Sequence, residues 1–261
     1  MHGIGNDYIV IDNRNGILGE PELSPTAKKI CLRHFSVGAD GLLLVQNADS
    51  ADIRMRMFNP DGSEAEMCGN GIRCFSKYVF ENDILSKKEF SIDTMDGIKK
   101  ISLETERDVV KKVLVDMGTP KVHELNQNFS VEKKEFKLNS ISMGNPHAVF
   151  FVEKITDELV LGLGPKIEVH ERFQPKKTNV EFVKVKNSTE IEVRVWERGV
   201  GETLACGTGA CAAVVAGISN GILDSQVEVH LLGGTLKIKY EKEKVSMEGP
   251  AETSFTGQII I

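Results

Sequence analysis

The chain contains 261 residues, of which 41% are hydrophobic, so it can build one large core or two of ordinary size and is not disordered as a whole. Its 38 acidic and 32 basic side chains give a formal charge of −6, which provides no overall positive field for nucleic acid or anionic lipid. The first residues lack the pattern of a secretory signal, no apolar run is long enough to span a bilayer, and five cysteines fit reduced thiols better than a disulfide framework. We therefore expect a soluble cytoplasmic protein that binds neither nucleic acid nor membranes.

Three elements are predicted early in the first half of the chain. A helix starts at Ser24, which can cap it, has Pro25 in its first turn and runs towards His34. A strand follows over Ile53–Phe58, because charged and apolar residues alternate there as a sheet with one wet face requires. The apolar run Ile72–Phe80 is long enough for a second helix.

The second half contains a similar series of elements after a polar stretch, Asp116–Ser140. We predict that this stretch is irregular and connects the two halves. Alternation predicts strands over Ile191–Trp196 and Leu236–Tyr240. Between them, Ala210–Ile218 is apolar all round, which is typical of a buried helix. A helix enclosed by its own sheet is the expected result.

The two halves are also similar to each other in sequence. Residues 52–71 and 190–209 align at an offset of about 138 positions, which is the size of a domain. The identical pairs are Ile53/Ile191, Arg56/Arg194, Glu64/Glu202, Cys68/Cys206, Gly69/Gly207 and Gly71/Gly209. The simplest interpretation is a duplication that gave two homologous halves.

Each half places a cysteine immediately before a predicted helix, in a Cys-Gly-x-Gly motif. A thiol at Cys68 or Cys206 would face the unpaired N–H groups and the positive end of the helix dipole, which favour the thiolate. The glycines that follow would let backbone amides approach an anionic ligand. A single motif of this kind is most often a turn beside an inert core cysteine. Two copies at equivalent places favour a functional site.

Two thiols suit a reaction that inverts a stereocentre. Such an enzyme needs a base that removes a proton from one face of a carbon and an acid that returns one to the other face. The ordinary thiol pKa of about 8.5 lies near working pH, so thiol and thiolate can coexist. Helix dipoles aimed at a substrate carboxylate would stabilise the charge that develops there, so no pyridoxal phosphate is required and we expect no cofactor.

The motifs of the whole chain carry a more specific resemblance. They are Gly3-Ile4-Gly5-Asn6-Asp7, Met67-Cys68-Gly69-Asn70-Gly71-Ile72-Arg73-Cys74, Gly144-Asn145-Pro146-His147, Thr178-Asn179-Val180-Glu181, Trp196-Glu197-Arg198-Gly199 and Ala205-Cys206-Gly207-Thr208-Gly209. In this order they resemble the diaminopimelate epimerase family. Asparagine at position 70 favours this family over the related proline racemases, which tend to have histidine there.

The resemblance implies a fold and an activity. The fold is of the α/β (α+β) class, with two homologous, pseudo-twofold-related domains that each wrap a mostly antiparallel, barrel-like sheet around a central helix. We expect the N-terminal lobe to comprise residues 1–113, completed by 250–261, and the C-terminal lobe to comprise 114–249. The implied activity is the cofactor-independent interconversion of LL- and meso-diaminopimelate for lysine and peptidoglycan precursors. The implied partner is a small amino-acid substrate, and the implied assembly is a homodimer.

The resemblance also implies residue roles. Cys68 and Cys206 would be the two acid/base residues, and His147 and Glu197 would tune their pKa values. The residues expected to bind the substrate are Gly69, Asn70, Gly207 and Thr208 at its carboxylate and Asn6, Asn59, Asn145, Asn179, Glu197 and Arg198 at its other polar groups. The planar fork of Arg198 suits a distal carboxylate.

Other interpretations compete with this one. No metal site is expected at the cysteines, because Cys74 and Cys211 diverge around their helices from Cys68 and Cys206. The same two-thiol chemistry also fits a racemase or epimerase of another amino acid, such as histidine. A binding protein that has lost catalysis is disfavoured by the two intact cysteines.

Overall fold

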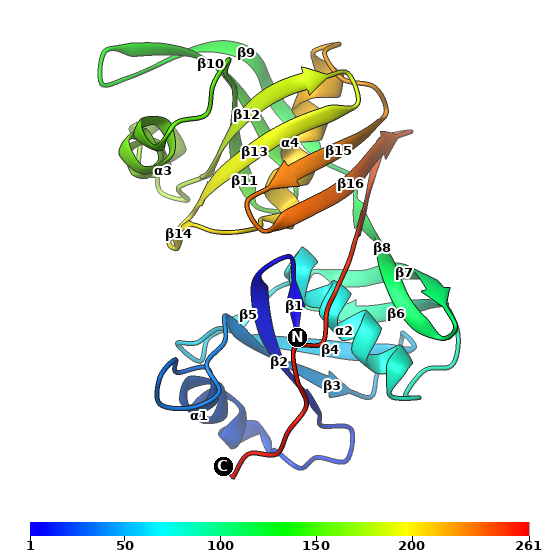
Figure 1. Ribbon diagram of the computed structural model, residues 1–261. Helices are drawn as coiled ribbons and strands as arrows, with labels where there is room; N and C mark the ends of the chain where they lie inside the picture. The colour runs from blue at the N-terminus through cyan, green and yellow to red at the C-terminus, as the bar shows by residue number, and fades with distance from the viewer. Residues whose placement is uncertain (261) are drawn as a thin grey trace. The chain divides into compact units, whose positions relative to one another are not determined.

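The computed structural model describes residues 1–260. These residues form two compact units (Figure 1). Unit 1 contains Met1–Val115 and the chain from Gly249 onward, and unit 2 contains Asp116–Glu248. Both units combine helices with a mostly antiparallel sheet, so the expected α+β class is confirmed. Within residues 1–260, no helix is both long and apolar enough to cross a membrane.

Unit 1 is built from eight strands and two helices among its described residues. They are β1 (His2–Gly3), β2 (Asn6–Asp12), α1 (Glu20–Ile30), β3 (Gly41–Gln46), β4 (Ile53–Phe58), β5 (Glu64–Ala65), α2 (Gly69–Glu81), β6 (Glu89–Thr94), β7 (Gly97–Glu106) and β8 (Val109–Gly118). Strand β8 crosses the boundary between the units.

Unit 2 is also a sheet with one long helix, to which short helical turns are added. Its elements are β9 (Lys121–Val131), β10 (Lys134–Ser142), β11 (Pro146–Phe151), η1 (Glu158–Leu163), α3 (Gly164–Glu168), η2 (Glu171–Phe173), β12 (Asn179–Asn187), β13 (Glu190–Glu197), β14 (Gly201–Glu202), α4 (Gly207–Ser219), β15 (Gln226–Leu231), β16 (Gly234–Glu241) and β17 (Lys244–Gly249).

The strand pairings of unit 1 recur in the same order in unit 2. In unit 1, β2 pairs parallel with β3, β3 antiparallel with β4, and β4 parallel with β6. In unit 2, β11, β12, β13 and β15 pair in this same sequence of orientations. The helix that follows the cysteine comes directly after β5 in unit 1 and directly after β14 in unit 2. The repeat in the sequence therefore corresponds to a repeat in topology.

The two long helices form the centres of their units, as the sequence predicted. Helix α4 is buried along most of its length and packs against β9–β13 and β16, and α2 packs against β1–β4 (Figure 1). Both helices begin earlier than expected, because the glycines after Cys68 and Cys206 already belong to the first turn. The strands predicted over Ile53–Phe58, Ile191–Trp196 and Leu236–Tyr240 are also confirmed.

The predicted start of α1 is wrong. The helix begins at Glu20 and ends at Ile30, so Ser24 does not cap it and Pro25 lies inside it. The first turn instead contains Pro21 and Glu22, and the Glu22 carboxylate accepts a hydrogen bond of 2.8 Å from the Gly19 amide. These start signals lie four residues before the serine-proline pair that suggested the later start.

The prediction of irregular structure over Asp116–Ser140 is also wrong. Strands β9 and β10 form a long antiparallel hairpin there, and β10 continues the sheet by pairing with β11. Only a few side chains of this hairpin, such as Phe129 and Leu138, are buried. The hairpin therefore carries a weak hydrophobic pattern, and its strands are stabilised by backbone pairing.

A buried thiol in α2 gives this fold a pH dependence. Burial raises the pKa of Cys74 from the ordinary thiol value to about 12, although the neighbouring Arg73 lowers it. Between these two pH values the unfolded chain has lost the proton and the folded chain keeps it, so stability falls as pH rises. The measurement is the free energy of unfolding, by urea denaturation at pH 9 and at pH 10. Between these two pH values, we expect it to fall by about 1 kcal/mol less in Cys74→Ala than in the wild type. Parallel declines would contradict this assignment.

Candidate active site

In unit 1, Cys68 occupies the N-cap of α2 and lies among polar side chains from β2. The Tyr8 hydroxyl is 2.9 Å from Cys68 Sγ and 2.7 Å from Asn6 Oδ1. Burial raises the pKa of Tyr8 well above its ordinary value, and the nearby Cys68 raises it further. Tyr8 therefore remains a phenol at neutral pH and can donate a hydrogen bond to the sulfur.

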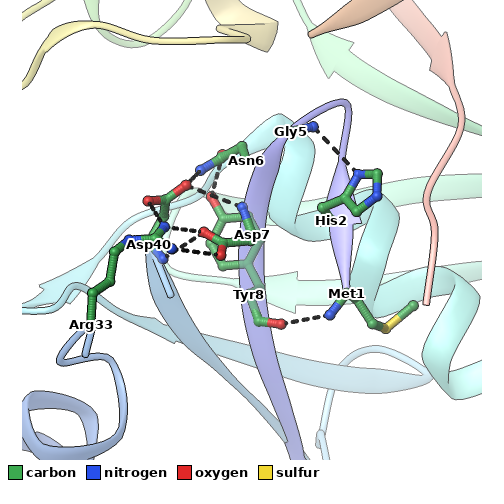
Figure 2. Close-up of polar contacts among 8 residues, drawn as sticks. All are labelled: Met1, His2, Gly5, Asn6, Asp7, Tyr8, Arg33 and Asp40. Carbon is green, nitrogen blue, oxygen red and sulfur yellow. Dashed lines mark hydrogen bonds and ion pairs between the residues drawn. The ribbon is translucent and has the colours of Figure 1, made fainter. Parts of the chain in front are cut away.

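The side chain of Asn6 is held in one orientation by an ionic network on the surface of unit 1. Asn6 Nδ2 donates to Asp40 Oδ2 at 2.7 Å, and Arg33 bridges Asp40 and Asp7 (Figure 2). Burial raises the pKa of Asp40, but hydrogen bonds from Asn6, the Asp7 amide and Arg33 lower it overall. The anionic Asp40 turns Asn6 Oδ1 towards Tyr8.

Asn70, in the first turn of α2, joins the same cluster. Its Nδ2 donates to Asn6 Oδ1 at 3.1 Å, and its Oδ1 accepts from the buried Arg73 at 3.0 Å. Arg73 also donates to the Gly69 carbonyl. Cys68, Gly69, Asn70 and Asn6, all expected at the site, thus lie in one cluster of unit 1.

Asn59, by contrast, is engaged in its own turn. It follows the end of β4, and its Nδ2 donates to Ser63 Oγ at 3.0 Å while its amide donates to the Ser63 carbonyl at 2.8 Å. This is the turn-forming role that asparagine often plays.

In unit 2, Cys206 occupies the N-cap of α4 and is buried. The Gly209 amide donates to Cys206 Sγ at 3.4 Å, and Thr208 Oγ1 lies 3.6 Å from the sulfur. Burial nevertheless raises the pKa of Cys206 well above its ordinary value, and the carboxylates of Glu197 and Glu181 raise it further. The helix N-terminus was expected to favour the thiolate of Cys206. Burial and the two carboxylates outweigh this effect and favour the thiol at neutral pH.

Glu197 lies beside this thiol at the end of β13. Burial raises the pKa of Glu197, whereas hydrogen bonds from the Thr203 hydroxyl and from Cys206 lower it. A carboxylate that accepts the thiol's hydrogen bond is placed to receive the proton of Cys206 or to return it.

A chain of hydrogen bonds connects Thr208 with the interior of unit 2. Asn145 Nδ2 donates to Thr208 Oγ1 at 3.3 Å, and Asn145 Oδ1 lies 2.9 Å from His147 Nε2. On its other side, His147 Nδ1 lies 2.7 Å from Glu181 Oε1, and both side chains are completely buried. Asn145, His147, Thr208 and Cys206 are therefore brought together.

Asn179 and Arg198 lie next to this chain. Asn179 stands opposite His147 in the pairing of β11 with β12, and its Oδ1 accepts from the Arg198 amide at 2.9 Å. The guanidinium of Arg198 is exposed and donates to the Lys176 carbonyl at 3.0 Å.

Two residues in these clusters had no predicted role. Tyr8 contacts Cys68, and Glu181 pairs with His147. The duplication carried a signal for Tyr8, which aligns with His147. The signal for Glu181 is a charged residue inside the otherwise apolar run Val180–Val183.

Comparisons with known proteins relate nearly the whole chain to one enzyme family. The model of the family described as Diaminopimelate epimerase matches residues 1–123 and 139–254. The chain is 46% identical to the diaminopimelate epimerase of Halothermothrix orenii, with 100% of this chain and 96% of that protein covered. It is 45% identical to that of Heliobacterium modesticaldum, with 99% and 98% covered.

A solved structure shows the same fold at low sequence identity. A probable proline racemase from Agrobacterium radiobacter, solved with bound carbonate, superposes with a TM-score of 0.77 at 15% identity and covers 100% of this chain and 91% of its own. Given the family match over nearly the whole chain, and relatives of almost equal length, the chain belongs to the diaminopimelate epimerase family.

Proposed function

We propose that the protein interconverts LL- and meso-diaminopimelate by a two-thiol mechanism without a cofactor. The observation that supports this most directly is the placing of Cys68 and Cys206 at the N-caps of equivalent helices, each beside a separate polar cluster. The 46% identity to a named diaminopimelate epimerase supports the choice of substrate.

In the proposed reaction one sulfur acts as base and the other as acid. A thiolate removes the α-proton, and the electron pair of the broken C–H bond is delocalised onto the substrate carboxylate. The second thiol gives its proton to the opposite face of the carbon, and its sulfur becomes the thiolate. The turnover conserves protons and exchanges the roles of the two sulfurs. The raised pKa of Cys206 supports its role as the acid when Cys68 is the thiolate.

The remaining residues bind the polar groups of the substrate or adjust the pKa values of the two thiols. We assign the carboxylate to the amides of Gly69, Asn70, Gly207 and Thr208, since helix N-termini stabilise negative charge. We assign the amino groups and the distal carboxylate to Asn6, Asn59, Asn145, Asn179, Glu197 and Arg198. His147 and Glu197 tune the thiols, and the contact of Glu197 with Cys206 supports its part of this role.

A second candidate keeps the chemistry and changes the substrate. A racemase of another amino acid, such as histidine, would use the same thiols but would not need a group for a distal carboxylate. The exposed Arg198, whose fork can hold a carboxylate bidentately, favours diaminopimelate.

Deuterium incorporation separates these candidates. We expect the purified protein, given LL-diaminopimelate in heavy water without added cofactor, to form the meso isomer with deuterium at the α-carbon. Mass spectrometry and chiral chromatography measure both. Exchange on a different amino acid, with none on diaminopimelate, would support the second candidate and refute the first.

We also propose how the chain is organised in the cell. We infer an N-terminal lobe of residues 1–113 with 250–261 that carries Cys68, and a C-terminal lobe of 114–249 that carries Cys206. We further infer a homodimer in the cytoplasm. Light scattering after size-exclusion chromatography tests the dimer, and a mass of about 29 kDa, that of one 28.8 kDa chain, would refute it.

A further inference from the structure

Glu181 is the most deeply buried carboxylate near either cysteine. Its side chain has no exposed surface, its Oε1 lies 2.7 Å from His147 Nδ1, and its Oε2 has no hydrogen-bond partner among residues 1–260. A buried carboxylate is costly unless a positive charge compensates it. The only cationic group in contact with it in the described part of the chain is the imidazole of His147, if that ring is protonated.

The contacts of His147 suit an imidazole that carries a proton on each ring nitrogen. Nδ1 faces a carboxylate oxygen of Glu181, and Nε2 faces the amide oxygen of Asn145 at 2.9 Å. The Asn145 amide is oriented because its nitrogen donates to Thr208 Oγ1. Both ring nitrogens thus face side-chain oxygen atoms, and an imidazole that carries both protons can donate a hydrogen bond to each of them.

The equivalent place in unit 1 is built differently. The pairing of β2 with β3 sets Val10 opposite Leu43, and the pairing of β11 with β12 sets Val149 opposite Glu181. Tyr8 and His147 likewise occupy equivalent positions, so a neutral pair, Tyr8 with Leu43, corresponds to an ionisable pair in unit 2. Beside Cys206, an ionisable pair of residues on adjacent strands therefore occupies the place that Tyr8 and Leu43 occupy in unit 1.

We propose that Glu181 is a positioning residue that holds His147 as an imidazolium and, through Asn145 and Thr208, orders the mouth of α4 around Cys206. This proposal rests on the proposed function only for its kinetic consequence. The imidazolium also offsets the charge of Glu181, one of the two carboxylates near the Cys206 thiol.

The test combines spectroscopy with kinetics. In ¹⁵N-labelled protein at pH 7, both ring nitrogens of His147 are expected to carry protons, the resonance being assigned by its absence in His147→Gln. In Glu181→Gln, which is nearly isosteric, one ring nitrogen loses its proton. kcat/KM for diaminopimelate falls at least about tenfold, the scale of effect seen when a partner that orients a functional histidine is removed. Glu181→Asp keeps the charge, so it retains both ring protons and recovers part of the activity.

A control variant and the contrary outcomes complete the design. Glu228→Gln removes an exposed carboxylate from β15 of the same unit and is expected to change neither the His147 resonances nor kcat/KM. A wild-type His147 with a single ring proton would overturn the proposal, as would a Glu181→Gln variant with full activity and both ring protons. If the wild type does not turn over diaminopimelate, the proposed function fails, whereas the nitrogen resonances still decide the state of the pair.

Discussion

Replacing either Cys68 or Cys206 by alanine is expected to lower the rate of epimerisation at least about 10²-fold, which corresponds to about 2.7 kcal/mol of barrier. The physical reason is that inversion needs proton transfer on both faces of the carbon, so one remaining sulfur cannot complete a turnover. The fold should persist, because each change removes only the sulfur atom of one residue at a helix N-cap. The measurement is the rate of meso-diaminopimelate formation, with far-UV circular dichroism to check folding.

Cys211→Ala is the matched control for these variants. Cys211 is a completely buried thiol in α4, the same helix that Cys206 caps, so its replacement imposes a similar loss of volume. We expect near wild-type turnover from this variant. Turnover within a few fold of wild type in Cys68→Ala or Cys206→Ala would refute the two-base mechanism.

The second large effect is expected from Gly209→Ala in the first turn of α4. A Cβ at this position would lie 2.8 Å from Glu181 Oε1 and 3.3 Å from Cys206 Sγ, so the carboxylate that pairs with His147 must move. Overpacking of this kind costs about 1–3 kcal/mol, and the better helix propensity of alanine returns at most about 1 kcal/mol. We expect a net loss of about 1–2 kcal/mol by urea denaturation and a more than tenfold loss of epimerase activity.

The duplication supplies the control at Gly71, the equivalent glycine of α2. There a Cβ would lie 3.4 Å from Leu43 Cδ2 and 3.4 Å from Tyr8 Cζ, which is ordinary van der Waals contact. We expect Gly71→Ala to remain within about 1 kcal/mol of wild type in stability. Equal losses of stability in the two alanine variants would show that helix propensity, and not the contact with Glu181, decides the result.

The sequence was most informative where its patterns were strong. The apolar run Ala210–Ile218 predicted the buried helix α4, and alternation predicted β4 and β13, because burial on all sides or on one side selects residues by period. It was least informative over Asp116–Ser140, where the hairpin of β9 and β10 buries few side chains. The start of α1 was misplaced because two overlapping sets of start signals lie within six residues, at Pro21 and at Ser24.

The residues of the candidate site also differ in how clearly the sequence revealed them. Cys68, Cys206 and the glycines after them could be recognised because a motif repeated at a domain-sized offset is rare by chance. Glu181 carried only the weaker signal of a charged residue in an apolar run, because a single glutamate in a strand gives no sign of its partner 34 residues away.

The sequence by itself determined the duplicated α+β plan, the two cysteine motifs at helix starts and the family, because these depend on periodicity and on residue identity along the chain. Only the tertiary structure decided the direction in which the pKa of Cys206 shifts, because this direction depends on burial and on charges from distant segments of the chain. Burial and the carboxylates of Glu181 and Glu197 raise the pKa of Cys206, although its place at a helix mouth alone would favour the thiolate.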